Sequence, residues 1–231
     1  ATPYFTRMSA HAAAGDFRAL RADLSSSLRT ILLLVTGAGA AIATAALPFG
    51  AFFGRDDAEI VGISSVLIAY LVGLIPFSTM FVLQRTFFAL GDTRTPFVIQ
   101  IVQAVTFTLG AIAIALWVPP SLIAVGIALA TAIASTVQAL TLALVLRRRI
   151  GGVDGRRIAT RLAIYLAAAV VAILAGVGVL ALLGGFSGGF AVADRFSAFV
   201  SIAVVGVVVM GAYILLLFVT RVPELRAGLA P

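Results

Sequence analysis

Long uncharged apolar runs dominate the sequence, and short polar stretches interrupt them. Residues 60–84 and 95–146 carry no charged side chain over 25 and 52 positions. A helix needs about 20 apolar residues to cross the ~30 Å hydrocarbon layer of a membrane. The pattern therefore predicts six transmembrane helices, at residues 30–54, 60–84, 97–118, 121–146, 162–184 and 197–220. These runs lack the alternation of polar and apolar residues that marks β-barrel strands, so we expect an all-α polytopic membrane protein.

Prolines and small residues predict how these helices end and pack. Pro119-Pro120 cannot continue a helix and predicts a tight hairpin between the third and fourth spans. Pro76 lies inside the second span and predicts a kink there. Two small-residue patterns indicate close helix contacts, namely Ala172-x-x-x-Gly176 and Gly206-x-x-x-x-Gly211.

The composition excludes several classes of function. Hydrophobic residues make up 62% of the chain and charged residues 11%, against about 45–50% and 25% in soluble domains. There is no cysteine, one histidine and no lysine, so the sequence predicts no enzyme, no cofactor and no metal site. The net charge of +7 comes from arginines that lie between the apolar runs. Arginines in such gaps favour anionic lipid headgroups, rather than nucleic acid, as partners.

The distribution of the sixteen arginines predicts the orientation. Only Arg55 and Arg195 fall on one side of the six spans, whereas the other fourteen fall on the opposite side. Cytoplasmic loops of membrane proteins carry the excess of basic residues. We therefore expect a multi-pass protein with both termini in the cytoplasm.

The same pattern gives an expected domain organisation. Residues 1–29 form a cytoplasmic segment with an amphipathic helix, which Asp16 caps. Its apolar face consists of Phe17, Leu20, Leu24 and Leu28. We expect this helix to lie in the plane of the lipid headgroups, and a solvated loop helix is the alternative. The remaining parts are four transmembrane helices (30–146), a basic cytoplasmic loop (147–161), two further helices (162–220) and a cytoplasmic tail (221–231).

A short polar turn joins the second and third spans. Gly91 can take the left-handed conformation that ends a helix, and Thr95 and Pro96 suit the cap and first position of the next helix. Asp92, Thr93 and Arg94 then form the exposed part of the turn. Two interpretations remain open: the turn is purely structural, or its charged pair serves the function.

Three stretches resemble one protein family. "FFALGDTRTPF", "ATPYFTRMSAHAAAGDFRALRADLSSSLR" and "ALPFGAFFGR" are similar to segments of the MurJ (MviN) lipid II flippases of the MOP transporter superfamily. The three stretches occur in the family's order and cover about the first hundred residues. One departure is that the proline of the N-terminal stretch stands at Pro3 rather than near Thr6.

The resemblance implies a place in a fourteen-helix transporter. The chain would hold the tail of the eighth helix and the last six helices, and would be the C-terminal part of a longer protein in the bacterial plasma membrane. The family translocates undecaprenyl-diphosphate-linked peptidoglycan precursor by alternating access for cell wall biogenesis, and a groove beside the last two helices takes the lipid tail. The implied partners are membrane lipid, lipid II as substrate, the missing N-terminal helices and other cell wall synthesis proteins.

Polar residues within the spans are the candidates for the substrate path. Arg85 lies six residues from Gly91, about 9 Å along a helix. Its side chain can therefore snorkel to the headgroups or line the cytoplasmic mouth of the path. Gln103 and Gln138 are cavity candidates, with interhelical hydrogen bonds as the alternative. Gln84 and Gln100 border or enter the spans as well.

Two other functions remain open at this point. One is a MOP-superfamily exporter of a different polyprenyl-linked glycan or of a small molecule. The other is a truncated membrane scaffold that transports nothing. The Asp-Thr-Arg-Thr-Pro turn favours the lipid II flippase over both.

Overall fold

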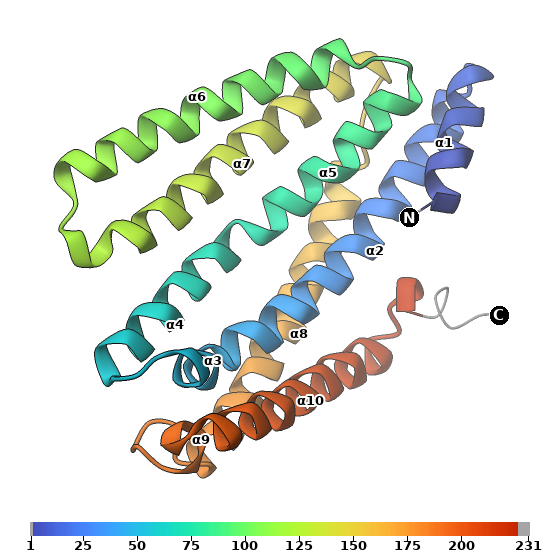
Figure 1. The fold of residues 1–231 in the computed structure, drawn as a ribbon. Helices are drawn as coiled ribbons and strands as arrows, with labels where there is room; N and C mark the ends of the chain where they lie inside the picture. Colours follow the sequence, from blue (N-terminus) through green and yellow to red (C-terminus); the bar gives the residue numbers. More distant parts are fainter. Residues whose placement is uncertain (1, 226–231) are drawn as a thin grey trace. The chain divides into compact units, whose positions relative to one another are not determined.

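The computed structural model describes residues 2–225, and their side chains from residue 6 onward. Arg226 and the end of the predicted tail lie outside the described residues. The described part consists of helices and connecting turns (Figure 1). In chain order the helices are α1 Thr2–Ala13, α2 Phe17–Thr44, α3 Ala46–Phe53, α4 Asp57–Val72, α5 Leu74–Ala89, α6 Arg94–Trp117, η1 Pro120–Leu122, α7 Ile123–Arg149, α8 Gly155–Leu182, α9 Phe190–Ala193 and α10 Arg195–Val219.

The apolar helices agree with the predicted spans. Among the described residues, five stretches are long and apolar enough to cross a membrane: α2, α6, η1 with α7, α8 and α10. The bent pair of α4 and α5 makes a sixth if it counts as one span. The all-α prediction is therefore confirmed. The predicted span 30–54 differs in detail, because Ala45 separates α2 from α3.

Both proline predictions are confirmed. The helix pair α4–α5 is broken at Gly73, three residues before Pro76. Proline lacks the N–H that would continue the ladder, and its ring crowds the carbonyl four residues earlier. Gly73 also lies against α7, where a Cβ would come within 3.0 Å of Ala132 Cα. Between α6 and α7, the backbone turns at Val118 and Pro119.

The chain divides into two compact units. The first unit comprises Ala1–Leu32 and Val72–Leu162, and the second comprises Leu33–Leu71 and Ala163–Pro231. In the first unit, α5, α6 and α7 lie side by side (Figure 1). The core of this unit includes Leu20, Leu24, Leu28, Phe87, Leu142 and Leu146, all at most 3% exposed.

The amphipathic segment packs on protein rather than on lipid. Asp16 accepts a hydrogen bond from the backbone N–H of Ala19 at 2.9 Å, so the predicted cap is confirmed. The helix that follows is not separate, because α2 runs unbroken into the first span. Leu20, Leu24 and Leu28 are buried in the first unit's core, and only Phe17 of the stripe is exposed. The expectation that this face rests on headgroups is therefore wrong, because protein already covers most of the stripe.

Helix α1 is held by α2 and α5. Arg7 pairs with Asp23 of α2 at 3.2 Å, and His11 Nε2 lies 3.6 Å from the same carboxylate. Met8 is buried, and its sulfur lies 3.7 Å from the Thr86 hydroxyl oxygen of α5. These contacts fix the N-terminal helix against the end of α5 that leads into the polar turn.

In the second unit, small residues allow close helix contacts. Gly37 of α2 meets the ring of Tyr213 from α10, and the Tyr213 hydroxyl donates to the Leu33 carbonyl at 2.8 Å. At Gly176 of α8, a Cβ would overlap Val209 and Thr44, which confirms the first small-residue pattern. The second pattern is wrong, because a Cβ at Gly206 or Gly211 would meet nothing within 4 Å.

Candidate functional site

The polar turn is built from local hydrogen bonds. Gly91 has φ of 72°, as predicted. Its N–H donates to the Phe88 carbonyl at 3.0 Å, and the N–H of Asp92 donates to the Phe87 carbonyl at 3.0 Å. This pair of bonds is the Schellman motif, which satisfies carbonyls at a helix end. Glycine is needed at position 91 because side chains disfavour this conformation.

Asp92, rather than Thr95, caps the next helix. Its Oδ1 accepts the backbone N–H of Thr95 at 3.0 Å, and its Oδ2 accepts the Thr95 hydroxyl at 2.7 Å. Helix α6 begins at Arg94, so Thr95 and Pro96 lie inside its first turn. The predicted cap at Thr95 is therefore wrong. Thr95 cannot cap this helix because its own backbone N–H is one of the free donors of the first turn, and Asp92 accepts it.

The carboxylate of Asp92 also forms an ion pair across the first unit. Arg149, the last residue of α7, donates from Nη1 to Asp92 Oδ2. The Asp92 side chain is 12% exposed, so this carboxylate is not the exposed group that the sequence predicts. Its hydrogen bonds to Thr95 and its pairing with Arg149 outweigh partial burial and lower the pKa of Asp92 to about 2. The turn thus ties the junction of α5 and α6 to the end of α7.

The rest of the turn is more open. Thr93 and Arg94 are exposed, whereas Pro96 is buried. Of the predicted charged pair, only Arg94 has no ion-pair partner within the described part of the chain. The structure therefore separates the two charges: one carboxylate is held in place, and one guanidinium is free to meet a ligand.

Arg85 lies over an aromatic ring of its own helix. Its guanidinium carbon is 5.4 Å from the centre of the Phe81 ring, a distance that suits a cation–π contact. Phe81 stands one turn before Arg85, on the side away from Gly91, so the side chain does not snorkel toward the turn in this structure. Phe77 continues the row, with its ring centre 6.4 Å from that of Phe81. Both rings are about half exposed.

Three glutamines form a chain between α6 and α7. Gln138 is 1% exposed and donates from Nε2 to Gln100 Oε1 at 2.8 Å. Gln100 in turn donates to Gln103 Oε1 at 2.8 Å. Gln138 thus makes an interhelical hydrogen bond, which was the alternative to a place in a cavity, and its side chain is buried. Gln103 ends the chain, and its side-chain nitrogen has no hydrogen-bond partner among the described residues.

The candidate residues all lie in the first unit, in two groups. Arg85 and the turn share α5 and its end, and the glutamine chain begins on α6 beyond the turn. Sequence reasoning missed Arg149, which it counted only as an orientation signal. Nothing in the sequence around Asp92 indicates that its side chain pairs with an arginine 57 positions later in the chain.

Comparison with known proteins relates the chain to one family by sequence and by fold. A family model described as "Lipid II flippase MurJ" matches residues 1–201. A solved structure described as "Lipid II flippase MurJ, inward closed conformation" is similar in fold, with a TM-score of 0.66 and 18% sequence identity. The match covers 92% of this chain but 41% of that structure, so this chain spans less than half of its length. No curated protein matches the chain.

Proposed function

Since the chain belongs to the MurJ family of lipid II flippases, we propose that it forms part of a transporter that moves lipid II across the bacterial plasma membrane. The observation that carries this proposal is the family match over residues 1–201. Members of this family are transporters in the plasma membrane, not enzymes. The long apolar helices of this chain fit such a location.

The finer proposal concerns the place of the chain in the transporter. Its six spans would correspond to the last six of the fourteen helices of a MOP-type fold, with both termini in the cytoplasm. Translocation would proceed by alternating access and serve cell wall biogenesis, with the lipid tail beside the spans at 162–220. The likeness to 41% of a MurJ structure supports a correspondence with part of that fold.

The faces of α5 and α6 supply the proposed substrate path. Arg85 places a positive charge on an exposed row of two aromatic rings, and the side-chain nitrogen of Gln103 has no hydrogen-bond partner among the described residues although it lies within a span. Polar groups in hydrocarbon need partners, so these two positions are better explained if they face a polar path. The diphosphate and sugars of lipid II offer acceptors for a guanidinium and an amide. Gln138 supports the path indirectly, because it holds Gln100 in place.

The test measures lipid II at the outer face of spheroplasts depleted of their own flippase. The gene that encodes this chain, expressed in full, should restore outward exposure of lipid II. We expect Arg85→Gln and Gln103→Leu each to reduce the rate about tenfold or more, because each removes a polar contact worth about 1.5 kcal/mol. Arg18→Gln is the matched control, because Arg18 is exposed in the first unit and lies outside the proposed path.

Two results would contradict the proposal. If the wild-type protein reaches the membrane but lipid II stays inside, the chain serves another MOP-type exporter or a scaffold. If wild-type activity is restored and both path variants equal the control, the family function stands and the path is wrong.

A further inference from the structure

The basic loop between α7 and α8 surrounds a hollow that the transport proposal does not use. The hollow has a volume of about 650 Å³, within the ~300–1,000 Å³ range of small-molecule sites. Its lining residues are Leu144, Arg147, Arg148, Gly151, Gly152, Val153, Gly155 and Arg156. Three of these eight are arginines and none is acidic, so the site favours an anion.

The loop that shapes the hollow is held by specific contacts. Gly151 and Gly152 have φ of 74° and 138°, conformations that glycine adopts readily. Arg21 of α2 donates to the Gly151 carbonyl at 3.2 Å. Ile150 just before them is 3% exposed and belongs to the first unit's core. The hollow is therefore a built feature of the loop and does not arise from a loosely attached chain.

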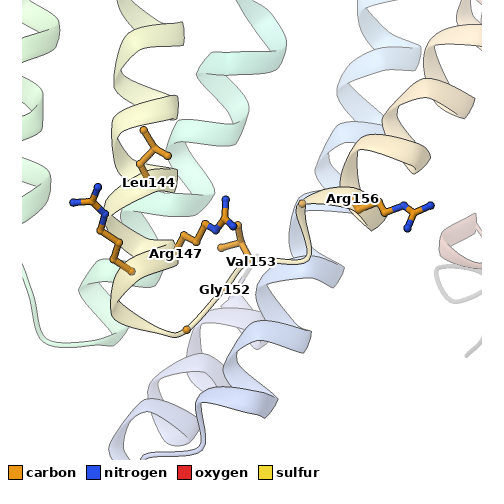
Figure 2. A pocket seen from close by; sticks show the side chains of 8 residues that line it. Leu144, Arg147, Gly152, Val153 and Arg156 are labelled. Carbon is orange, nitrogen blue, oxygen red and sulfur yellow. The ribbon is translucent and has the colours of Figure 1, made fainter.

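The charges around the hollow are uncompensated. Arg149 is paired with Asp92, but no carboxylate pairs with Arg147, Arg148 or Arg156 in the part of the chain that the structure describes. Figure 2 shows Arg147 reaching toward Val153 across the loop, whereas Arg156 extends outward from the start of α8. Arg147 thus lies within the hollow. Arg156 adds positive potential at its rim, which acts over a Debye length of about 8 Å.

The hollow also has an apolar end. Leu144 lies on α7 one turn before Arg147 (Figure 2) and is 59% exposed, and Arg148 is the next residue of the same helix. Residues three and four apart share one helix face, so a single ligand can touch Leu144 and the arginines together. Free phosphate would use only the arginines. A ligand with a phosphate and an attached hydrocarbon would use both ends.

We propose that this hollow binds the phosphate headgroup of an anionic membrane lipid. Helices α7 and α8 are both candidate spans and meet at this loop, so the loop falls at the depth where lipid headgroups lie. Guanidinium groups bind phosphate oxygens through paired, charge-assisted hydrogen bonds. The glycerol and first methylenes of the lipid pack against Leu144.

The test measures binding of fluorescent phosphatidylglycerol to the full-length protein in neutral detergent, with phosphatidylcholine as the zwitterionic comparison. Wild type should prefer phosphatidylglycerol. The double variant R147Q/R148Q should weaken its binding about tenfold, since each arginine near an anionic headgroup contributes appreciably to affinity. The double variant R18Q/R157Q removes the same charge from exposed positions outside the hollow and should bind as wild type. Circular dichroism should show the same helix content in all three.

Each arm of the experiment separates one alternative. An equal loss in R18Q/R157Q would overturn the site and leave only general charge attraction. Displacement of the lipid by inorganic phosphate at equal concentration would overturn the lipid assignment and identify a soluble phosphate ligand. Unchanged binding in R147Q/R148Q with intact helix content would overturn the proposal outright.

Discussion

At the scale of single residues, the carboxylate of Asp92 joins three helices. The carboxylate accepts the Thr95 N–H at the start of α6 and pairs with Arg149 at the end of α7, and the backbone N–H of Asp92 closes the end of α5. A group with so many partners contributes to stability as well as to any function of the turn. Removal of the Asp92 side chain is therefore expected to lower the stability of the protein and not only to affect its function.

Asp92→Ala should lower the free energy of unfolding by about 1–2 kcal/mol, because a helix cap and an ion pair disappear together. Asp92→Asn should cost clearly less, since an asparagine oxygen can still accept the Thr95 N–H. Arg94→Ala is the control and should change stability little, because Arg94 is exposed and has no ion-pair partner. Thermal unfolding in detergent, followed by circular dichroism, compares the three. Equal losses for the alanine and asparagine variants at position 92 would contradict the capping role.

The same carboxylate predicts a dependence on pH. Its pKa is lowered to about 2 in the folded protein, from an ordinary value of 3.8. A lowered carboxyl pKa means that the stabilisation is complete above about pH 4 and is lost as the pH falls through about 2. Between pH 5 and pH 2 we therefore expect wild type to lose more thermal stability than Asp92→Asn, measured in the same detergent. Parallel curves for the two proteins would contradict the assignment.

The sequence predicts part of this site because part of it is local. The left-handed Gly91 and the end of α5 follow from residues within one turn of each other. The predicted cap at Thr95 was wrong although the deciding contact is local, because Asp92 was assigned to the exposed part of the turn when its carboxylate accepts from Thr95 three residues later. Arg149 was missed because its contact depends on how α7 packs beside α5.

At the scale of helices, a glycine allows a close helix contact only where a second helix lies against it. Gly176 and Gly206 look alike in the sequence, and both lie inside apolar helices. Gly176 faces Val209 and Thr44, whereas Gly206 faces open space. The pattern of small residues gives the spacing along one helix, but the partner comes from the fold.

Gly176→Val should therefore destabilise the protein, by about 1–3 kcal/mol, because the added methyl groups overlap packed side chains. Gly206→Val is the matched control, with the same chemical change in another apolar helix of the second unit, and should leave stability nearly unchanged. Urea or thermal unfolding in detergent gives both values. A similar loss at both positions would mean that the effect belongs to glycine in a helix and not to the contact.

The sequence predicts the helices of the fold better than their packing. Among the described residues, apolar run length identified the five long apolar stretches and the bent pair α4–α5, because the hydrocarbon layer imposes a minimum length. The division at Ala45 lies three residues before Pro48, the same spacing as between Gly73 and Pro76, but only Pro76 was considered as a source of a break within a span. The stripe of Leu20, Leu24 and Leu28 was assigned to lipid because a buried face and a membrane face have the same composition.

At the scale of the whole molecule, the arginine distribution predicts which loops face the cytoplasm. The chain has no cysteine, so a thiol reagent labels only a cysteine that is introduced by substitution. Asp154→Cys should be protected from an impermeant thiol reagent in intact cells, and Ser187→Cys should react. Both residues are exposed in loops, and permeabilised cells provide the control in which both react. Labelling of Asp154→Cys from outside would reverse the predicted orientation.

The Schellman turn after α5 has a consequence for how the protein is made. Apart from the ion pair with Arg149, its hydrogen bonds join residues between Phe87 and Thr95, so these local bonds can close the turn before later residues are synthesised. Chains emerge from the ribosome at about 5–20 residues per second, which puts several seconds between this turn and the appearance of Arg149. The hairpin of α5 and α6 can thus enter the translocon already bent. When α7 follows, Arg149 adds its ion pair with Asp92 to a turn that has already formed.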